Sequence, residues 1–157
     1  MKQKTNVTAE EGKQEIVVER VFELPVALLY KAYTEPELVE QWMGNKVLKL
    51  ENKAHGGYQF ETVDERGNVL FKAHGTIHSV EENRNITRTF EMAGFPAQLE
   101  FLDFESLGAE SSKLRMQMVF RSVADRDNLL KMPFAAGVNM AHNRLEEAVG
   151  QLKSPSL

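Results

Sequence analysis

The sequence contains no cysteine, a single tryptophan and no long apolar run. Without cysteine the chain has no disulfide, no thiolate nucleophile and no cysteine ligand for zinc or an iron–sulfur cluster. No segment approaches the roughly 18 consecutive apolar residues of a transmembrane helix, so membrane insertion is not expected. The first residues are polar and lack the apolar core of a secretory signal, which makes a cytoplasmic location the default expectation.

The sequence also lacks a concentrated basic region. Its 19 lysines and arginines are scattered among 23 acidic residues, for a net charge of −4. Nucleic-acid binding requires clustered positive charge, so no nucleic-acid partner is expected. Gly56-Gly57 precedes an expected strand, whereas phosphate-binding loops open a helix. His74 and His78 would lie about 13 Å apart along a strand, too far to share a metal ion. Neither a cofactor nor a metal is expected.

The composition, 42% hydrophobic and 27% charged residues, is that of a folded globular domain. A chain of 157 residues is long enough to build one hydrophobic core. Residues 1–14 show neither helical nor strand periodicity, and we expect them to form a frayed or disordered tail. Residues 15–152 contain no linker, repeat or low-complexity tract, which predicts a single domain.

The longest helical pattern covers about residues 133–152. Apolar residues recur there every three or four positions, at Leu130, Phe134, Val138, Ala141, Leu145, Ala148 and Leu152. This spacing places them on one face of a helix. Asn139, Asn143 and Glu146 fall on the opposite face, which is expected to contact water. A helix with one apolar face requires another layer of structure to cover that face.

Seven earlier segments have the character of strands, at about residues 15–22, 46–51, 57–63, 69–80, 86–92, 97–104 and 112–121. Two short helices, beginning near Pro25 and Thr34, separate the first segment from the second. The remaining connections are too short for crossover helices, so the sheet should be an antiparallel meander.

The segment 97–104 breaks the alternation of the other strands. Leu99 and Phe101 share one parity, whereas Leu102 and Phe104 share the other. One extra residue would return these apolar side chains to a common face, so we predict a β-bulge near Leu102.

This order of elements resembles the helix-grip fold of the START-like (SRPBCC) superfamily, to which the birch-pollen allergen fold also belongs. Local motifs are similar to the branch named for the activator of the ninety-kilodalton heat-shock protein ATPase. They are YTEPEL at residues 33–38 leading to Trp42, GGYQF at 56–60, Gly67, HGTI at 74–77 and GVNMAHNRL at 137–145. The resemblance implies an α+β fold in which a curved, seven-stranded antiparallel sheet wraps around a long C-terminal helix. That branch usually has tryptophan after the glycine of the last motif, where this chain has Val138.

The resemblance implies three functions of different kinds. The first is binding of a small apolar or amphipathic molecule between the C-terminal helix and the sheet. The alternative is a co-chaperone-like module with a chaperone partner, and the third is an enzyme of the cyclase or hydrolase kind. No serine lies in a nucleophile elbow, and we assign no catalytic residue. The sequence gives no indication of the oligomeric state.

The expected cavity residues lie on the inward faces of the sheet and the long helix. They are Phe60, Phe71, Arg88, Phe90, Phe101, Met116, Met118, Phe134, Val138, His142 and Leu145. Apolar walls with a few polar groups are typical of small-molecule pockets. The same bulky side chains could also fill the space as an ordinary core, which is the alternative interpretation.

Two polar residues in this set need partners. Arg88 shares its parity with Ile86 and should point to the concave side of the sheet. A buried guanidinium requires a negative partner, which predicts either the acidic group of a ligand or a structural pair with Glu100 or Asp103. A register shift of the strand, which would change the direction of Arg88, is the remaining alternative. His142 lies on the flank of the apolar helix face, where it either reaches the cavity mouth or is an edge histidine that is solvated or has satisfied hydrogen bonds.

Overall fold

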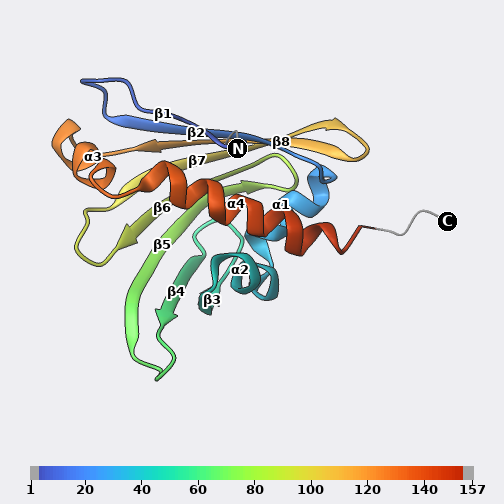
Figure 1. Cartoon of the computed structure of the whole chain (residues 1–157), viewed down its shortest axis with the longest axis horizontal. Helices are drawn as coiled ribbons and strands as arrows, with labels where there is room; N and C mark the ends of the chain where they lie inside the picture. Colours follow the sequence, from blue (N-terminus) through green and yellow to red (C-terminus); the bar gives the residue numbers. More distant parts are fainter. Residues whose placement is uncertain (1–3, 154–157) are drawn as a thin grey trace.

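The computed structural model describes residues 4–153, in which one curved antiparallel sheet wraps around the C-terminal helix (Figure 1). The strands are β1 (Asn6–Thr8), β2 (Glu15–Phe22), β3 (Lys46–Leu50), β4 (Gly57–Val63), β5 (Val69–Glu81), β6 (Asn85–Met92), β7 (Gln98–Gly108) and β8 (Ser111–Val119). The helices are α1 (Val26–Thr34), α2 (Pro36–Met43), α3 (Val123–Leu130) and α4 (Phe134–Gly150). The strand order is β1-β2-β8-β7-β6-β5-β4-β3. The predicted α+β helix-grip fold is confirmed.

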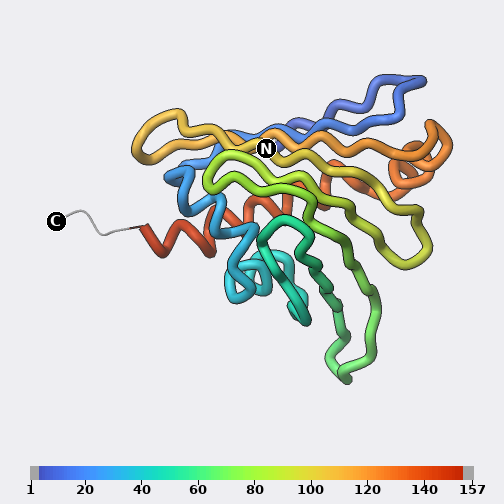
Figure 2. The backbone as a smooth tube through the Cα atoms, turned by 180° about the vertical axis from the view of Figure 1, so that it is seen from behind, coloured from blue at the N-terminus to red at the C-terminus, as the bar shows by residue number. Residues whose placement is uncertain are grey.

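Helix α4 lies along the concave face of the sheet. It runs from α3 at one end to α1 and α2 at the other (Figure 1). The view from behind shows the strands in front and α4 on their far side (Figure 2). The outer part of the β4–β5 hairpin extends away from α4 in both views. The helix therefore covers the middle of the sheet and leaves this hairpin uncovered.

The N-terminal segment differs from the prediction. Residues 1–3 of the expected tail lie outside the described residues, but the segment that follows is ordered. Asn6 and Thr8 of β1 pair with Glu19 and Val17 of β2, which gives the sheet eight strands in place of the expected seven. Thr5 is buried, with 3% of its surface exposed. The expectation of a frayed tail fails here because the order comes from contacts with distant elements, which local periodicity does not reveal.

The predicted bulge near Leu102 is also wrong. Strand β7 pairs with β6 and β8 in unbroken register around this residue. Leu102 and Phe104 point into the core, whereas Phe101 lies on the other face. The alternation is hidden in the sequence because two polar residues, Gln98 and Glu100, occupy inward positions of the same strand.

The core is divided between the two ends of α4. Leu145 and Val149, in its C-terminal half, are fully buried against the sheet, α1 and α2. A smaller cluster below the start of the helix contains Ile16, Val18 and Met118. Helix α4 is thus held tightly at its C-terminal half and less closely at its N-terminal half.

Helix α4 is shorter than predicted, and its polar side faces water only in part. It starts directly after Pro133, and Leu152 lies beyond its end with 54% of its surface exposed. Asn139, Asn143 and Glu146, predicted to face solvent, hydrogen-bond to the N-terminal segment and to β2. Asn143 is still exposed, and Asn139 and Glu146 are half-buried, so the polar face contacts both protein and water.

Strand β5 passes very close to its neighbours at Gly75, and this contact predicts a stability effect. The Tyr58 hydroxyl crosses this position to donate a hydrogen bond to the Thr89 carbonyl oxygen. A Cβ atom at Gly75 would overlap that oxygen and lie 2.6 Å from the Tyr58 hydroxyl. Gly75→Ala is expected to lower the free energy of unfolding by about 1–3 kcal/mol, because the crowded atoms must move apart. Urea denaturation measures this change.

The matched control is Gly137→Ala in α4, where an added Cβ meets no atom within 4 Å. Alanine is favoured over glycine in a helix by about 1 kcal/mol, so this variant should be as stable as the parent or more stable. Equal stability of the two alanine variants would show that the close approach at Gly75 does not require glycine.

Candidate ligand-binding cavity

A cavity of about 490 Å³ lies between the N-terminal half of α4 and the concave face of the sheet. This volume is within the usual range of small-molecule sites, about 300–1,000 Å³. The walls are mostly apolar and consist of Tyr33, Trp42, Met43, Arg88, Phe90, Met92, Phe95, Pro96, Gln98, Glu100, Met116, Met118, Leu129, Met132, Pro133, Phe134, Gly137, Val138, Ala141 and His142. The bulky side chains of the sheet therefore do not fill the space below the helix.

The cavity exists because α4 carries small side chains where it crosses the sheet. Gly137, Val138 and Ala141 form its roof, and none of them is long enough to reach the opposite wall. The turn before α4 completes the wall at one end, where Met132 is 43% exposed. This exposed wall residue indicates where the cavity opens to solvent.

Seven of the eleven predicted cavity residues line the cavity: Arg88, Phe90, Met116, Met118, Phe134, Val138 and His142. The other four lie elsewhere. Phe60 and Leu145 belong to the main core. Phe101 lies on the sheet face turned away from α4, because the expected bulge is absent. Phe71 has the inward parity but is 51% exposed, since β5 pairs with β6 only from Ala73 onward and the hairpin extends beyond the helix.

The cavity also contains residues that the sequence analysis did not assign to it. Tyr33 comes from α1, and Gln98 and Glu100 come from β7. The sequence does indicate the direction of Gln98 and Glu100, because both residues share the parity of the buried Leu102. Gln98 and Glu100 interrupt the apolar alternation of β7 because they belong to the polar side of the cavity.

Arg88 and Glu100 form a buried ion pair in the cavity wall. The Arg88 Nε donates to Glu100 Oε1 at 2.9 Å, and the Gln98 side-chain amide donates to Glu100 Oε2 at 2.8 Å. The two ionic side chains are 8% and 4% exposed. Of the alternatives for Arg88, the structural pair with Glu100 is confirmed. Both oxygens of the carboxylate are therefore engaged.

The remaining donors of Arg88 are directed at the cavity. Within residues 4–153, neither of its terminal amino groups donates a hydrogen bond, although both retain accessible surface. The guanidinium also lies over the Tyr58 ring, 5.1 Å from the ring centre. Burial lowers the pKa of Arg88, but the negative charges of Tyr58, when ionised, and of Glu100 outweigh this effect and raise it above its ordinary value. Arg88 therefore presents fixed, charged hydrogen-bond donors.

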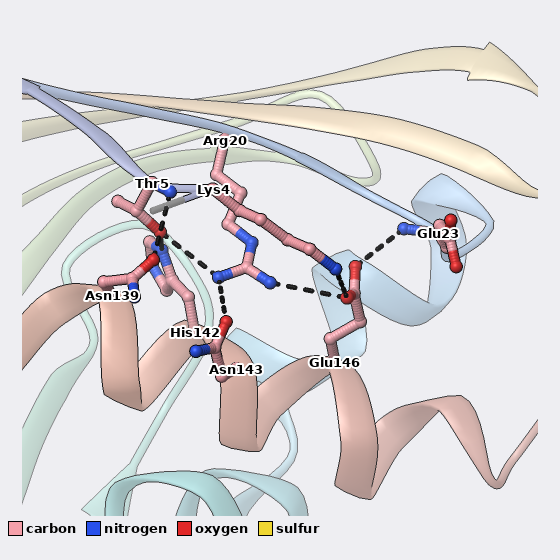
Figure 3. A network of polar contacts seen from close by, with 8 residues as sticks. All are labelled: Lys4, Thr5, Arg20, Glu23, Asn139, His142, Asn143 and Glu146. Carbon is pink, nitrogen blue, oxygen red and sulfur yellow. Dashed lines mark hydrogen bonds and ion pairs between the residues drawn. The ribbon is translucent and has the colours of Figure 1, made fainter. Parts of the chain in front are cut away.

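A second polar group connects the cavity wall to the N-terminal segment (Figure 3). Arg20 of β2 donates to Asn143 at 2.7 Å and to the Thr5 hydroxyl at 3.3 Å, and it pairs with Glu146 at 3.4 Å. The Thr5 hydroxyl is 3.0 Å from His142 Nδ1. We call Thr5, Arg20, Asn143 and Glu146 the Arg20 network. It binds β2, α4 and the N-terminal segment together.

His142 links the Arg20 network to the cavity. Its Nε2 lies 3.2 Å from the Tyr33 hydroxyl oxygen, so both ring nitrogens have hydrogen-bond partners. Burial, with a smaller contribution from the charge of Arg20, lowers the pKa of His142 to about 3. Burial also raises the pKa of Tyr33 above its ordinary value. At neutral pH both groups are uncharged. His142 is thus a satisfied histidine, as one interpretation held, but it is buried and not at an edge.

In the described part of the chain, no three histidine, aspartate or glutamate side chains converge as metal ligands. None of the helices in residues 4–153 has the length and apolarity needed to cross a bilayer. The chemistry that this site offers is an apolar surface with a small cluster of hydrogen-bond donors at one side.

Comparison with known proteins places the chain in a family. Residues 23–150 match the family model described as Activator of Hsp90 ATPase homolog 1-like protein. The chain belongs to this family. The match covers helices α1 to α4 and strands β3 to β8, so the cavity lies within the part that the Activator of Hsp90 ATPase homolog 1-like family shares. A search of curated proteins found no match.

Several solved structures have the same fold as this family member. The crystal structure of protein Ms6760 from Mycobacterium smegmatis has a TM-score of 0.80 at 15% identity, over 98% of each chain. A crystal structure from Rhodobacter sphaeroides has a TM-score of 0.82 at 16% identity, over 94% of this chain and 100% of that one. A solution structure from Arthrobacter aurescens has a TM-score of 0.83 at 11% identity, over 93% and 91%. At such identities the likeness shows the fold and no function.

Proposed function

We propose that this protein binds a small apolar or amphipathic molecule in the cavity between α4 and the sheet. The observation that carries the proposal is a cavity of about 490 Å³ with mostly apolar walls and unused donors on Arg88. Burial of apolar ligand surface would supply the affinity, at about 25 cal/mol per Å². The polar cluster would orient the ligand.

Binding fits the polar groups of the cavity better than catalysis does. General acid–base chemistry needs a side chain free to exchange a proton with the substrate. Both oxygens of Glu100 accept hydrogen bonds from protein, and both nitrogens of His142 are within hydrogen-bond distance of protein hydroxyls. These groups are held in place by their neighbours, which supports a binding role.

The proposal predicts the effect of filling the cavity. Val138→Trp introduces a large side chain into the roof of the cavity, at the position where the family usually has tryptophan. We expect the variant to fold and to lose bound ligand, or to bind added ligand at least about tenfold more weakly, because the space is occupied. Native mass spectrometry of freshly purified protein, followed by organic extraction, identifies any bound molecule, and titration calorimetry then gives its affinity.

The matched control is Met140→Trp, on the same helix but 59% exposed. It should leave ligand binding unchanged. Equal binding by both tryptophan variants, or an empty parent protein that binds nothing from a panel of apolar and amphipathic compounds, would contradict the proposal.

A second candidate function is interaction with a chaperone, as the family description suggests. One observation favours it: the outer part of the β4–β5 hairpin exposes Val63, Val69, Leu70 and Phe71. Clustered exposed apolar side chains often mark a protein-binding surface. An empty cavity together with stimulation of the ATPase of a purified Hsp90 chaperone is the result that would select this candidate over ligand binding.

A further inference from the structure

The polar side of the cavity carries charges of both signs that cancel. Among the twenty residues that line the cavity, Arg88 is the one basic residue apart from His142 and Glu100 is the one acidic residue, and the two form an ion pair. His142 is neutral, because its pKa is lowered to about 3, and Tyr33 is neutral because its pKa is raised. The wall therefore has no net charge, although it presents charged hydrogen-bond donors.

These donors define what the head group of a ligand must supply. Arg88 is 6% exposed, and its two terminal amino groups have no acceptor within residues 4–153. Both amino groups keep accessible surface but have no protein acceptor in the described part of the chain, so a ligand that brings an acceptor oxygen gains free energy by bonding to them. Because a guanidinium only donates, a head group that can itself only donate, such as an ammonium, would leave them unsatisfied.

The acceptor oxygen can belong to a neutral carbonyl or to an anionic carboxylate, and the charge of the wall decides between them. Removing an ionised carboxylate from water costs several kcal/mol, and this cost is offset only if the binding site has a net positive charge. Here Glu100 already neutralises Arg88 from 2.9 Å away, and a second carboxylate beside the pair would also be repelled by Glu100. A ketone, ester or amide oxygen would gain the Arg88 hydrogen bonds without this cost.

We infer that the cavity selects uncharged molecules with a carbonyl-type acceptor over their carboxylate counterparts, and that the buried charge of Glu100 imposes this selection. This inference rests on the proposed ligand-binding function and names its ligand class. It replaces the simpler expectation that Arg88 binds an acidic group. Glu100 acts here through Arg88 as a specificity-determining residue.

The test compares two ligands of equal size. A medium-chain fatty acid and the methyl ketone with the same number of carbons are titrated into the full chain at neutral pH by calorimetry. The ketone is expected to bind at least about tenfold more tightly. Equal or tighter binding of the acid, with the ketone also bound, overturns the selection while leaving the binding function intact. If neither compound binds, the result contradicts the proposed ligand-binding function and therefore also this inference.

A variant of Glu100 then tests whether its charge causes the preference for the ketone. Glu100→Gln removes the negative charge but retains an oxygen that can accept from Arg88, so the wall gains a net positive charge. The preference should shift toward the acid by at least about tenfold. Glu105→Gln, an exposed position on the same strand, is the control and should keep the ketone preference. Circular dichroism verifies folding, and the comparison in the parent protein remains decisive if the variant is unstable. An unchanged ketone preference in folded Glu100→Gln would overturn the role of Glu100.

Discussion

Replacing Glu100 with leucine is expected to lower the free energy of unfolding by about 3–5 kcal/mol. The carboxylate accepts from Arg88 and from Gln98, and all three side chains are buried. Without it, the Arg88 charge remains in the cavity wall with no negative partner, and the Gln98 amide loses its acceptor. Equilibrium urea denaturation followed by circular dichroism measures the loss.

Two further variants separate the charge from the lost packing. The double variant Arg88→Met with Glu100→Leu removes both charges, and it should recover much of the stability because a well-packed apolar pair often replaces a buried ion pair at little cost. Glu105→Leu, exposed on the same strand, should change stability little. A double variant less stable than Glu100→Leu would mean that the uncompensated charge of Arg88 is not the cause.

Acidification is expected to destabilise the protein through His142. Its pKa is about 3 in the folded state, against 6.5 as the ordinary value. Below about pH 6.5 the unfolded chain binds a proton at this residue that the folded chain excludes, so stability falls as the pH falls, until the pH reaches about 3. The loss from this residue alone is about 2 kcal/mol by pH 5. Urea denaturation at a series of pH values measures it.

Other groups also titrate in this range, and His142→Gln isolates the contribution of the histidine. Glutamine retains polar atoms for Thr5 and Tyr33 but does not titrate. His55, His74 and His78 are exposed and present in both proteins, so their contributions cancel in the difference. The variant should lose less stability on acidification than the parent, by about 2 kcal/mol at pH 5. Parallel stability curves would show that His142 is readily protonated in the folded state.

Periodicity was sufficient for most of the fold. The change from alternation to helical spacing located β2 to β8 and α4, because each of these elements has one face in a common core. Strand β1 was missed for a physical reason. It has only three residues, and the buried residue before it, Thr5, is polar and is ordered by bonds to Asn139 and to the His142 ring.

The candidate site was predictable where parity determines which way a side chain points. Arg88 was placed correctly on the concave side, and its partner Glu100 was among the alternatives. The same rule misplaced Phe71, because parity gives the face of a strand and not whether another layer covers that face. The sequence could not decide whether the cavity is open or filled. Its volume depends on the distance between α4 and the sheet where α4 carries small residues such as Gly137.

The position of β2 has a consequence for the order in which the protein is made. Its partner on one side is β8, with Phe22 opposite Ser112 and Glu15 opposite Val119. About 100 residues must therefore be synthesised after β2 before all of β8 is available, and until then the apolar residues of β2 lack this neighbouring strand. The meander from β3 to β8 can form first from neighbouring hairpins, and the docking of β2 is the long-range step that closes the fold. Pairing with β8 also sets the position of Arg20, so the contacts of Arg20 that hold α4 over the cavity depend on this long-range step.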